Sequence, residues 1–275
     1  MIKIENTEVV GWEAAIRGMR NPMNSWAKSD SYDAVDCKAC GILDKNGICK
    51  KEDRLGVCDN YRCYEVGPND HDLMMRLAAG GPVHAKYRRM INVYVDITAP
   101  LYWWKEFDTY KIGTVANSCS TMHKIQAKEF TLDDFSCEHL LDCCSEELMY
   151  VPELKNYQVP LDILRDTIRC LNYYRDEYIR IEKRLRDDDT LTYNGRKHLV
   201  SIQKRMWWQM IQLLPSSYNQ KRTVMMNYEV LRNIFESRKG HKLDEWHDVC
   251  RWIVSLPYSE IITGEPRRVD DYGKK

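Results

Sequence analysis

The stretch that decides the fold is Ile91-Asn-Val-Tyr-Val-Asp-Ile-Thr98, in which apolar and polar residues alternate strictly. Successive side chains of an extended chain point to opposite faces, so every second residue shares a face. The apolar residues of one face are Ile91, Val93, Val95 and Ile97. The pattern predicts a strand with one face in the core and the other partly exposed.

The segments on either side of this strand predict shorter elements. The predicted elements before it are a short strand at residues 2–5, a helix from Thr7 to Arg20 that Asn21-Pro22 stops, and a helix from Asp70 to Ala79 closed by Gly80-Gly81-Pro82. After the strand, Pro100 suits the first turn of a helix that runs through Phe107. The N-terminal half is therefore expected to combine short strands with short helices.

The C-terminal half has helical periodicity. Apolar residues recur at spacings of three and four from Leu161 to Leu185, which predicts a long amphipathic helix. After a loop that contains 187–189 and Asn194-Gly195, residues 199–213 predict its antiparallel partner, and two shorter helices follow around 228–235 and 243–253. We therefore expect an α+β fold, with a small mixed or antiparallel sheet, flanking helices and a long antiparallel helix pair.

Composition excludes several classes of protein. The chain has 275 residues, with 41 basic side chains against 41 acidic ones and 44% hydrophobic residues, which argues against disorder. The balanced charge leaves no net field for nucleic acid or an anionic membrane. No window approaches the ~18 uninterrupted apolar residues of a spanning helix, and the start lacks signal-peptide features, so we expect a cytosolic chain with reduced thiols. The 17 Tyr and 8 Trp suit half-wet clefts and subunit interfaces.

A cysteine cluster interrupts the pattern between residues 37 and 63. The candidate metal ligands are Cys37, Cys40, Cys49, Cys58 and Cys63. Thiolates at such spacings can converge on one tetrahedral Zn²⁺. A polar segment with few apolar residues has no core of its own, so it needs a crosslink such as a bound metal ion to be ordered. Five candidates for four places leave the ligand assignment open, and a surface insertion with free thiols is the alternative.

Two polar segments are candidate ligand sites. Asn117-Ser-Cys-Ser-Thr-Met-His123 gathers small hydrogen-bonding side chains where there are few apolar anchors, which suits a polar ligand, although a capped turn has the same composition. His84 with Arg88 and Arg89 stands just before the predicted strand and has the charge to bind a phosphate. Solvated charges at a strand entrance are the alternative interpretation.

Three stretches, in order, resemble the flavin-dependent thymidylate synthase family, whose motifs include H-x-S-x-x-E-H, R-H-R-x7-S, N-x-R and an L-R before H-A-Q-x-E. With His84 on the first histidine, Tyr110-Lys111-Ile112 falls on R-H-R, and Ser120 fills the serine position seven residues later. Leu213-Leu214-Pro215 resembles the family's V-L-P. Farther on, Asn227, Asn233 and Arg238 fall on the N-x-R asparagine, a second cofactor-facing position and the L-R arginine.

The departures from the family pattern concern its cations. Tyr110, Lys111 and Ile112 replace all of R-H-R, and three more family arginines are replaced, by Met122, Ile211 and Glu229. In the family these cations hold the nucleotide phosphate and the flavin, and each lost charge-assisted hydrogen bond is worth ~1.5 to 3 kcal/mol. Either other cations resupply the charge, or the scaffold is kept while the chemistry changed or was lost. The available cations are Arg88, Arg89, Lys105, Lys111 and Arg222.

The resemblance implies a homotetramer that binds FAD, takes hydride from NADPH and transfers a one-carbon unit from methylenetetrahydrofolate to C5 of a uracil nucleotide such as dUMP. It implies that Arg238 and Ser120 belong to the catalytic site, and that His84, Asn227 and Asn233 contact the cofactor. The substrate-binding candidates are Arg88, Arg89, Lys111, Asn117, Ser118 and Arg222. We expect one domain over residues 1–262, with the cysteine insertion at 37–63, and a polar tail at 263–275.

Other hypotheses stay open at this point. One is a catalytically silent nucleotide-binding or assembly protein on the same scaffold, with the cysteine segment as a contact surface. The other is a different pyrimidine-modifying activity. Bound flavin distinguishes the enzyme from the silent protein.

Overall fold

The computed structural model describes residues 2–35, 62–143, 145 and 159–265. The chain folds into two compact units that are interleaved in sequence. Unit 1 comprises Met1–Glu5, Asp96–Thr109 and Ala116–Thr223, and unit 2 comprises Asn6–Val95, Tyr110–Val115 and Val224–Lys275. The expectation of a single domain over residues 1–262 stays a prediction.

The main sheet has four strands in the order β1-β4-β6-β5. Their bounds are Lys3–Val10 for β1, Asn92–Pro100 for β4, Thr114–Ser118 for β5 and Asn219–Asn227 for β6. The alternation that predicted β4 is confirmed, because the four apolar side chains of that face are at most 1% exposed. This face of β4 is therefore part of the core.

A second, two-stranded sheet flanks the cysteine segment. Strands β2 (Tyr32–Val35) and β3 (Arg62–Glu65) pair antiparallel, with Tyr32 opposite Glu65 and Val35 opposite Arg62. The sequence analysis predicted neither strand. Both are only four residues long and, among the described strands, pair only with each other, so each carries too few residues to show a periodicity.

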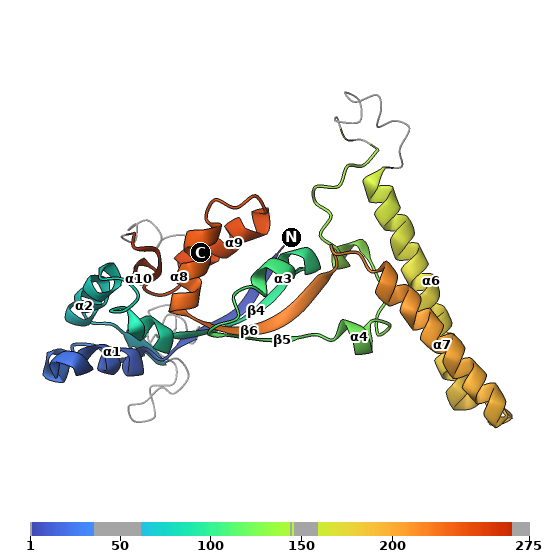
Figure 1. The fold of residues 1–275 in the computed structure, drawn as a ribbon, viewed down its shortest axis with the longest axis horizontal. Coiled ribbons are helices and arrows are strands. Elements are labelled where there is room, and N and C mark those ends of the chain that lie inside the picture. The colour runs from blue at the N-terminus through green and yellow to red at the C-terminus, as the bar shows by residue number, and fades with distance from the viewer. Residues whose placement is uncertain (1, 36–61, 144, 146–158, 266–275) are drawn as a thin grey trace, which may run out of the picture. The chain divides into compact units, whose positions relative to one another are not determined.

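Helices surround the core of unit 2 (Figure 1). They are α1 (Trp12–Arg20), α2 (Pro68–Ala79), the 3₁₀ helix η3 (Lys86–Met90), α8 (Tyr228–Arg238), α9 (Asp244–Ser255) and α10 (Glu260–Thr263). Helix α8 is central, because it packs against α9, α10 and η3, while α1 packs on η3. The ring of Trp12 makes edge contacts with Tyr228 and Tyr258, which joins the start of α1 to this group.

The predicted helix from Thr7 to Arg20 is wrong in its first part. The strand β1 continues to Val10, and α1 begins only at Trp12. Between them Gly11 has a φ of 96°, a left-handed conformation that favours glycine, and an added Cβ would lie 2.2 Å from the carbonyl oxygen of Met90. This close packing ends the strand and sets the start of the helix.

The long helix pair of unit 1 is confirmed. Helix α6 spans Pro160–Asp187 and α7 spans Tyr193–Leu213, and the two run side by side (Figure 1). The expectation that Asn194-Gly195 lies in the loop is wrong, because the hydroxyl of Thr192 accepts a hydrogen bond from the Gly195 N–H and caps α7. The pair therefore extends farther than its apolar periodicity indicates.

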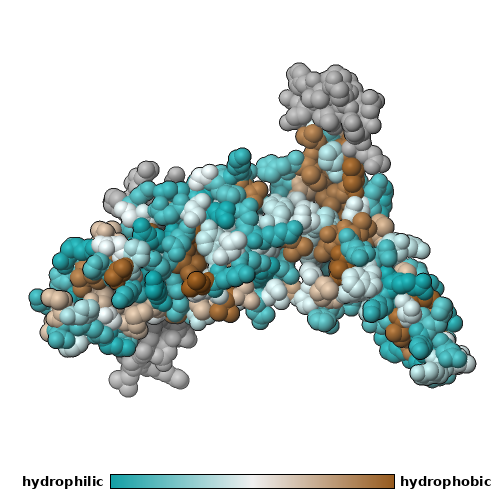
Figure 2. Space-filling model, in the orientation of Figure 1, coloured by the Kyte–Doolittle hydropathy of each residue, from teal (hydrophilic) through white to brown (hydrophobic). Residues whose placement is uncertain are grey.

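Buried aromatic and aliphatic side chains form the base of the helix pair. Helix α3 (Leu101–Phe107) and the short α4 (Thr121–Lys124) also belong to unit 1. The buried cluster comprises Ile125, Phe130, Phe135, Leu164, Ile168, Leu171 and Met210. The rest of α6 and α7 is less buried, and hydrophobic side chains reach the surface along the pair (Figure 2).

Among the described helices, none combines the length and apolar character that crossing a membrane requires.

Candidate functional site

Arg238, the last residue of α8, is held between two aromatic rings in unit 2. Its guanidinium carbon lies 4.7 Å from the ring centroid of Trp246 and 5.6 Å from that of Tyr110. Its Nε donates a hydrogen bond of 2.9 Å to the Tyr110 hydroxyl. The side chain is half-buried, so the cation is oriented and partly desolvated, which strengthens its interaction with a polar ligand. Tyr110 and Arg238, which the resemblance predicts to fall on the first residue of R-H-R and on the L-R arginine, are thus in direct contact.

The turn before α9 sets the position of Trp246. The Nδ1 of His241 accepts a hydrogen bond of 3.1 Å from the Leu243 N–H, and the carbonyl oxygen of His241 lies 2.7 Å from Nε2 of His247. The His241 ring also meets Trp246 edge-on at a centroid distance of 6.3 Å. The turn at 241–243 therefore orients one of the rings that hold Arg238.

Asn227 has a structural role that its motif position did not indicate. It is the N-cap of α8, and its Oδ1 accepts hydrogen bonds from the N–H groups of Glu229 and Val230 at 3.1 and 3.0 Å. Its Nδ2 lies 2.8 Å from the place where a Cβ on Gly113 would stand, and Gly113 has a φ of 78°. This close approach brings the segment after Tyr110-Lys111-Ile112 against the start of α8.

Asn233 does not share the face of α8 that carries Arg238. At 3.6 residues per turn, Asn227 and Arg238 lie about three turns apart on one face, while Asn233 lies about a third of a turn around the helix. Its side chain is exposed. His84, Arg89 and Lys111, the other candidates of unit 2, are exposed as well. Their polar groups are open to a ligand.

Arg88 is a buried cation of unit 2. It is 1% exposed, and its Nη1 lies 3.4 Å from Oε2 of Glu229, which is also buried. Its Nε is buried and has no hydrogen-bond partner among the described residues. The motif resemblance predicts that Glu229 falls on the N-x-R arginine, and in this structure its carboxylate neutralises Arg88. Arg88 is therefore not among the cations that are open to a phosphate.

Replacing Glu229 by Gln is expected to destabilise the fold by about 2 kcal/mol, because it leaves the buried guanidinium of Arg88 without a counter-charge. Urea denaturation followed by far-UV circular dichroism measures this change. Glu236→Gln is the matched control, since Glu236 is exposed on the same helix and pairs at the surface with Lys239. A loss as small as that of the control would show that the buried pair contributes nothing.

The candidates at residues 117–120 lie on the surface of unit 1. Asn117 and Ser118 end the edge strand β5, and Ser120 is the N-cap of α4, where its Oγ accepts a hydrogen bond of 3.1 Å from the His123 N–H. Cys119, between the strand and the cap, donates from its N–H to the Lys221 carbonyl at 3.0 Å. The polar segment is thus both a capped turn and an exposed, anchored surface.

Arg222 is already paired within unit 1. Its Nη1 lies 2.7 Å from Oδ1 of Asp108, its Nε donates to Oε1 of Gln220 at 3.0 Å, and its guanidinium carbon lies 4.1 Å from the ring centroid of Trp104. Trp104 in turn donates from Nε1 to the Gln220 carbonyl at 2.9 Å. Asp108 neutralises the charge, so Arg222 is a weaker phosphate ligand than its sequence position indicates.

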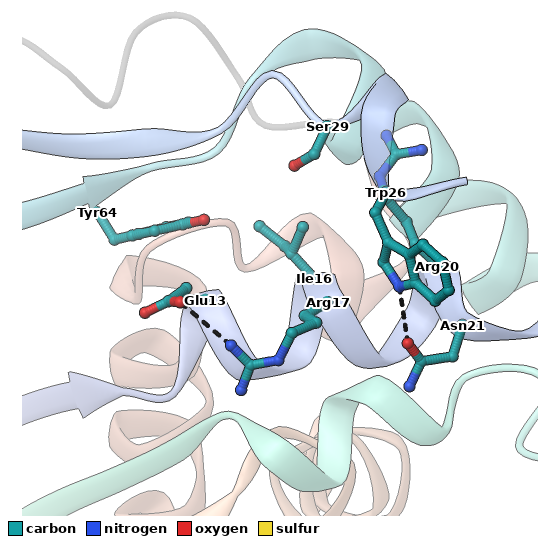
Figure 3. Close-up of a pocket in the computed structure, with 8 residues that line it drawn as sticks. All are labelled: Glu13, Ile16, Arg17, Arg20, Asn21, Trp26, Ser29 and Tyr64. Atoms are coloured by element: carbon teal, nitrogen blue, oxygen red, sulfur yellow. Dashed lines mark hydrogen bonds and ion pairs between the residues drawn. The ribbon is translucent and has the colours of Figure 1, made fainter. Parts of the chain in front are cut away.

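Unit 2 also contains a pocket of about 400 Å³ that the sequence analysis missed (Figure 3). It is lined by Glu13, Ile16, Arg17, Arg20, Asn21, Trp26, Ser29 and Tyr64. Arg17 pairs with Glu13 at 3.2 Å, and Trp26 donates to Asn21 at 2.8 Å. Burial raises the pKa of Tyr64. Seven of the eight lining residues come from 13–29, and Tyr64 comes from β3.

Most of the predicted zinc site lies outside the described residues. This applies to Cys37, Cys40, Cys49 and Cys58, while the backbone of Cys63 lies in β3 opposite Ala34. Within residues 2–35, 62–143, 145 and 159–265, no group of three or more His, Cys, Asp or Glu side chains is arranged to hold a metal ion. The zinc site stays a prediction.

Comparison with known proteins relates the chain by its fold. No protein-family model matches the sequence, and no curated protein matches it. Two solved structures of thymidylate synthase X from Helicobacter pylori with FAD and dUMP give TM-scores of 0.51 and 0.50, at 15% and 14% identity, and cover 95% and 94% of this chain and 96% of each of theirs. A UMP/dUMP methylase, PolB, from Streptomyces cacaoi gives a TM-score of 0.49 at 12% identity, with 97% of each chain covered.

The two structures from Helicobacter pylori confirm the predicted fold class. This chain has a small sheet with many helices and shares the fold of the flavin-dependent thymidylate synthase named in those structures. At 14–15% identity the similarity concerns the fold alone.

Proposed function

We propose that this chain is a flavin-dependent enzyme that methylates a uracil nucleotide. In this proposal a one-carbon unit passes from methylenetetrahydrofolate to C5 of dUMP or a related pyrimidine nucleotide, with NADPH as the reductant and FAD as the cofactor. The observation that carries the proposal is Arg238, oriented by Tyr110 and Trp246 at the motif position that contacts the pyrimidine in the family. The shared fold supports it. By the same resemblance we propose a cytosolic homotetramer.

The proposed flavin contacts in unit 2 are Asn227, Asn233 and His84. The isoalloxazine edge presents carbonyl oxygens and ring nitrogens, which side-chain amides and imidazoles match as donors and acceptors. Asn233 and His84 are exposed, and Asn227 retains its Nδ2 donors because the helix cap uses its Oδ1. These residues would hold FAD, which when bound supplies hydride transfer.

Arg238 would act on the substrate by polarising it. A guanidinium near a pyrimidine carbonyl stabilises the negative charge that develops on the ring as C5 becomes nucleophilic. Stacking on two rings fixes the direction of its N–H groups before the substrate arrives, so little reorganisation is needed. In unit 2 the exposed Lys111 and Arg89 are candidate cations for the phosphate.

Purified protein is expected to be yellow or to take up added FAD with a saturable change in the flavin absorption band. With methylenetetrahydrofolate and NADPH it should release tritium from dUMP labelled at C5, because methylation replaces that hydrogen. Omitting the folate is the control for exchange alone. A colourless protein that takes up no added FAD would overturn the proposal and favour a catalytically silent scaffold.

A further inference from the structure

The pocket of unit 2 that Figure 3 shows is separate from the group around Arg238. It lies between α1, the 3₁₀ helix η2 (Trp26–Lys28) and β3, and its lining shares no described residue with that group. Its volume of about 400 Å³ is in the range of small-molecule sites. The proposed methylation uses none of its lining residues, so the pocket has no role in that reaction.

Two aromatic rings and one aliphatic side chain form the apolar part of the pocket. Ile16 is 2% exposed and lies between Tyr64 and Trp26 in Figure 3. Trp26 is 50% exposed, although its Nε1 donates a hydrogen bond of 2.8 Å to Oδ1 of Asn21, which holds the ring in place. An indole that is held but half uncovered provides a flat surface on which a planar heterocycle can stack.

Both cations of the pocket are already paired. Arg20 is 4% exposed, its Nε donates to Oδ1 of Asp70 at 2.5 Å, and its other two nitrogens donate to backbone carbonyls at 3.2 and 3.1 Å. Arg17 pairs with Glu13 at 3.2 Å. The described lining therefore presents no unbalanced charge, which favours an uncharged ligand over a phosphate or a carboxylate.

Three polar groups of the lining retain hydrogen-bonding capacity. The Tyr64 hydroxyl and Nδ2 of Asn21 form no hydrogen bond with any residue that the structure describes. Burial raises the pKa of Tyr64, and nearby carboxylates, with Asp70 foremost, raise it further, so at neutral pH the hydroxyl is protonated and can donate. Glu13 uses only Oε1 toward Arg17, which leaves Oε2 as an acceptor. The pocket thus offers two donor groups and an acceptor beside an aromatic surface.

We propose that this pocket binds an uncharged, amino-substituted nucleobase, carried as the free base or as a nucleoside such as adenosine. The ring stacks on Trp26, its amino group donates to Glu13, and its ring nitrogens accept hydrogen bonds from Tyr64 and Asn21. The substrate dUMP does not fit this description, because uracil has no amino group and the phosphate is charged. The pocket is therefore a second ligand site, and the inference goes beyond the proposed function without depending on it.

Titration of the full chain with 2-aminopurine riboside tests this assignment, because stacking on an indole quenches the fluorescence of this base. Saturable quenching that adenosine reverses is expected, and the lack of it would overturn the proposal. Trp26→Leu should raise the half-saturating concentration about tenfold, since it removes the stacking surface. Trp208→Leu is the matched control, because Trp208 is 40% exposed in unit 1 and should match the wild type.

A second variant tests the polar contact without removing the ring. Tyr64→Phe should raise the half-saturating concentration about threefold, because one neutral hydrogen bond is lost. Tyr32→Phe is its control, since Tyr32 is exposed on the neighbouring strand β2 and does not line the pocket. Far-UV circular dichroism shows that each variant is folded, and unchanged titrations in the folded pocket variants would overturn the assignment.

Competitors identify the class of ligand. Uridine lacks the amino group and should displace the probe about tenfold more weakly than adenosine, and equal displacement would overturn the contact with Glu13. Displacement by AMP, NADPH or FAD at a lower concentration than adenosine would overturn the uncharged ligand. Tritium release from dUMP is measured separately, so failure of this titration leaves the methylating activity standing, and a protein that takes up no FAD leaves the pocket assignment standing.

Discussion

Replacing Asp70 by Ala is expected to lower the free energy of unfolding by about 3–5 kcal/mol, because it leaves the buried Arg20 without its counter-charge. Asp70 is 0% exposed, and its Oδ1 accepts a hydrogen bond of 2.5 Å from Nε of Arg20. Its Oδ2 accepts from the hydroxyls of Ser29 and Ser31 at 2.7 and 2.6 Å. One carboxylate thus joins α1, the segment at 29–31 and α2.

Chemical denaturation at pH 7 measures the effect, and Asp72→Ala is the matched control. Asp72 lies on the same helix in an exposed pair with Arg76, so its loss should cost less than about 1 kcal/mol. Equal effects for the two variants would show that the buried pair does not hold unit 2 together.

The same carboxylate predicts a dependence of stability on pH. Burial raises the pKa of Asp70, but hydrogen bonds from Ser31, Ser29, Arg20 and the Asp30 N–H together lower it below its ordinary value. The unfolded chain, with a pKa of about 3.9, then binds more protons than the folded one as the pH falls. The stabilisation is complete above that value and is lost as the pH falls through the folded pKa, so the difference between wild type and Asp70→Ala should shrink under acid conditions.

Replacing Arg238 by Met is expected to lower the turnover of dUMP by about 10²–10³-fold, because methionine cannot donate to the charge that develops on the pyrimidine. Tyr110→Phe should have a smaller effect, about tenfold, since it removes only the hydroxyl that orients Nε of Arg238. Tritium release from labelled dUMP measures turnover, and flavin absorption shows whether FAD binding is retained in each variant.

Lys239→Met is the control for Arg238→Met. Lys239 follows Arg238 at the end of α8 and pairs at the surface with Glu236, so its loss should leave turnover unchanged. Full turnover in Arg238→Met would remove this residue from the catalytic site. A rise in KM with kcat unchanged would show that Arg238 binds the substrate and the transition state equally.

Elements with a strong local period were predicted well. The alternation in β4 and the three-and-four spacing in α6 and α7 are patterns among residues that are close in the sequence. They can therefore be recognised without knowing what the segment packs against. The helix predicted from Asp70 to Ala79 was also found, and it begins two residues earlier, at Pro68, which suits a first helical turn. Strand β6 was missed, since its buried positions begin with Gln220 and only Val224 and Met226 among them are apolar.

The sequence predicted which residues belong to the candidate site, but not which side chains contact one another there. The motif resemblance drew attention to Arg238, Asn227 and Ser120, which lie at a helix end, a helix cap and an exposed turn, but it did not indicate that the Tyr110 hydroxyl would accept a hydrogen bond from Arg238. The sequence also offered Arg88 and Arg222 as candidate substrate-binding cations, whereas the fold pairs them with Glu229 and Asp108.

The amino-acid order therefore determined where the chain is extended, where it is helical and which residue types stand at the family's motif positions. Chain folding decided which charges remain free. Arg88 and Glu229 are 141 residues apart, and Arg20 and Asp70 are 50 apart, so only the closed fold brings each pair together. Charges that burial brings into contact are neutralised there. Those left on open surfaces, such as Lys111, remain available to a ligand.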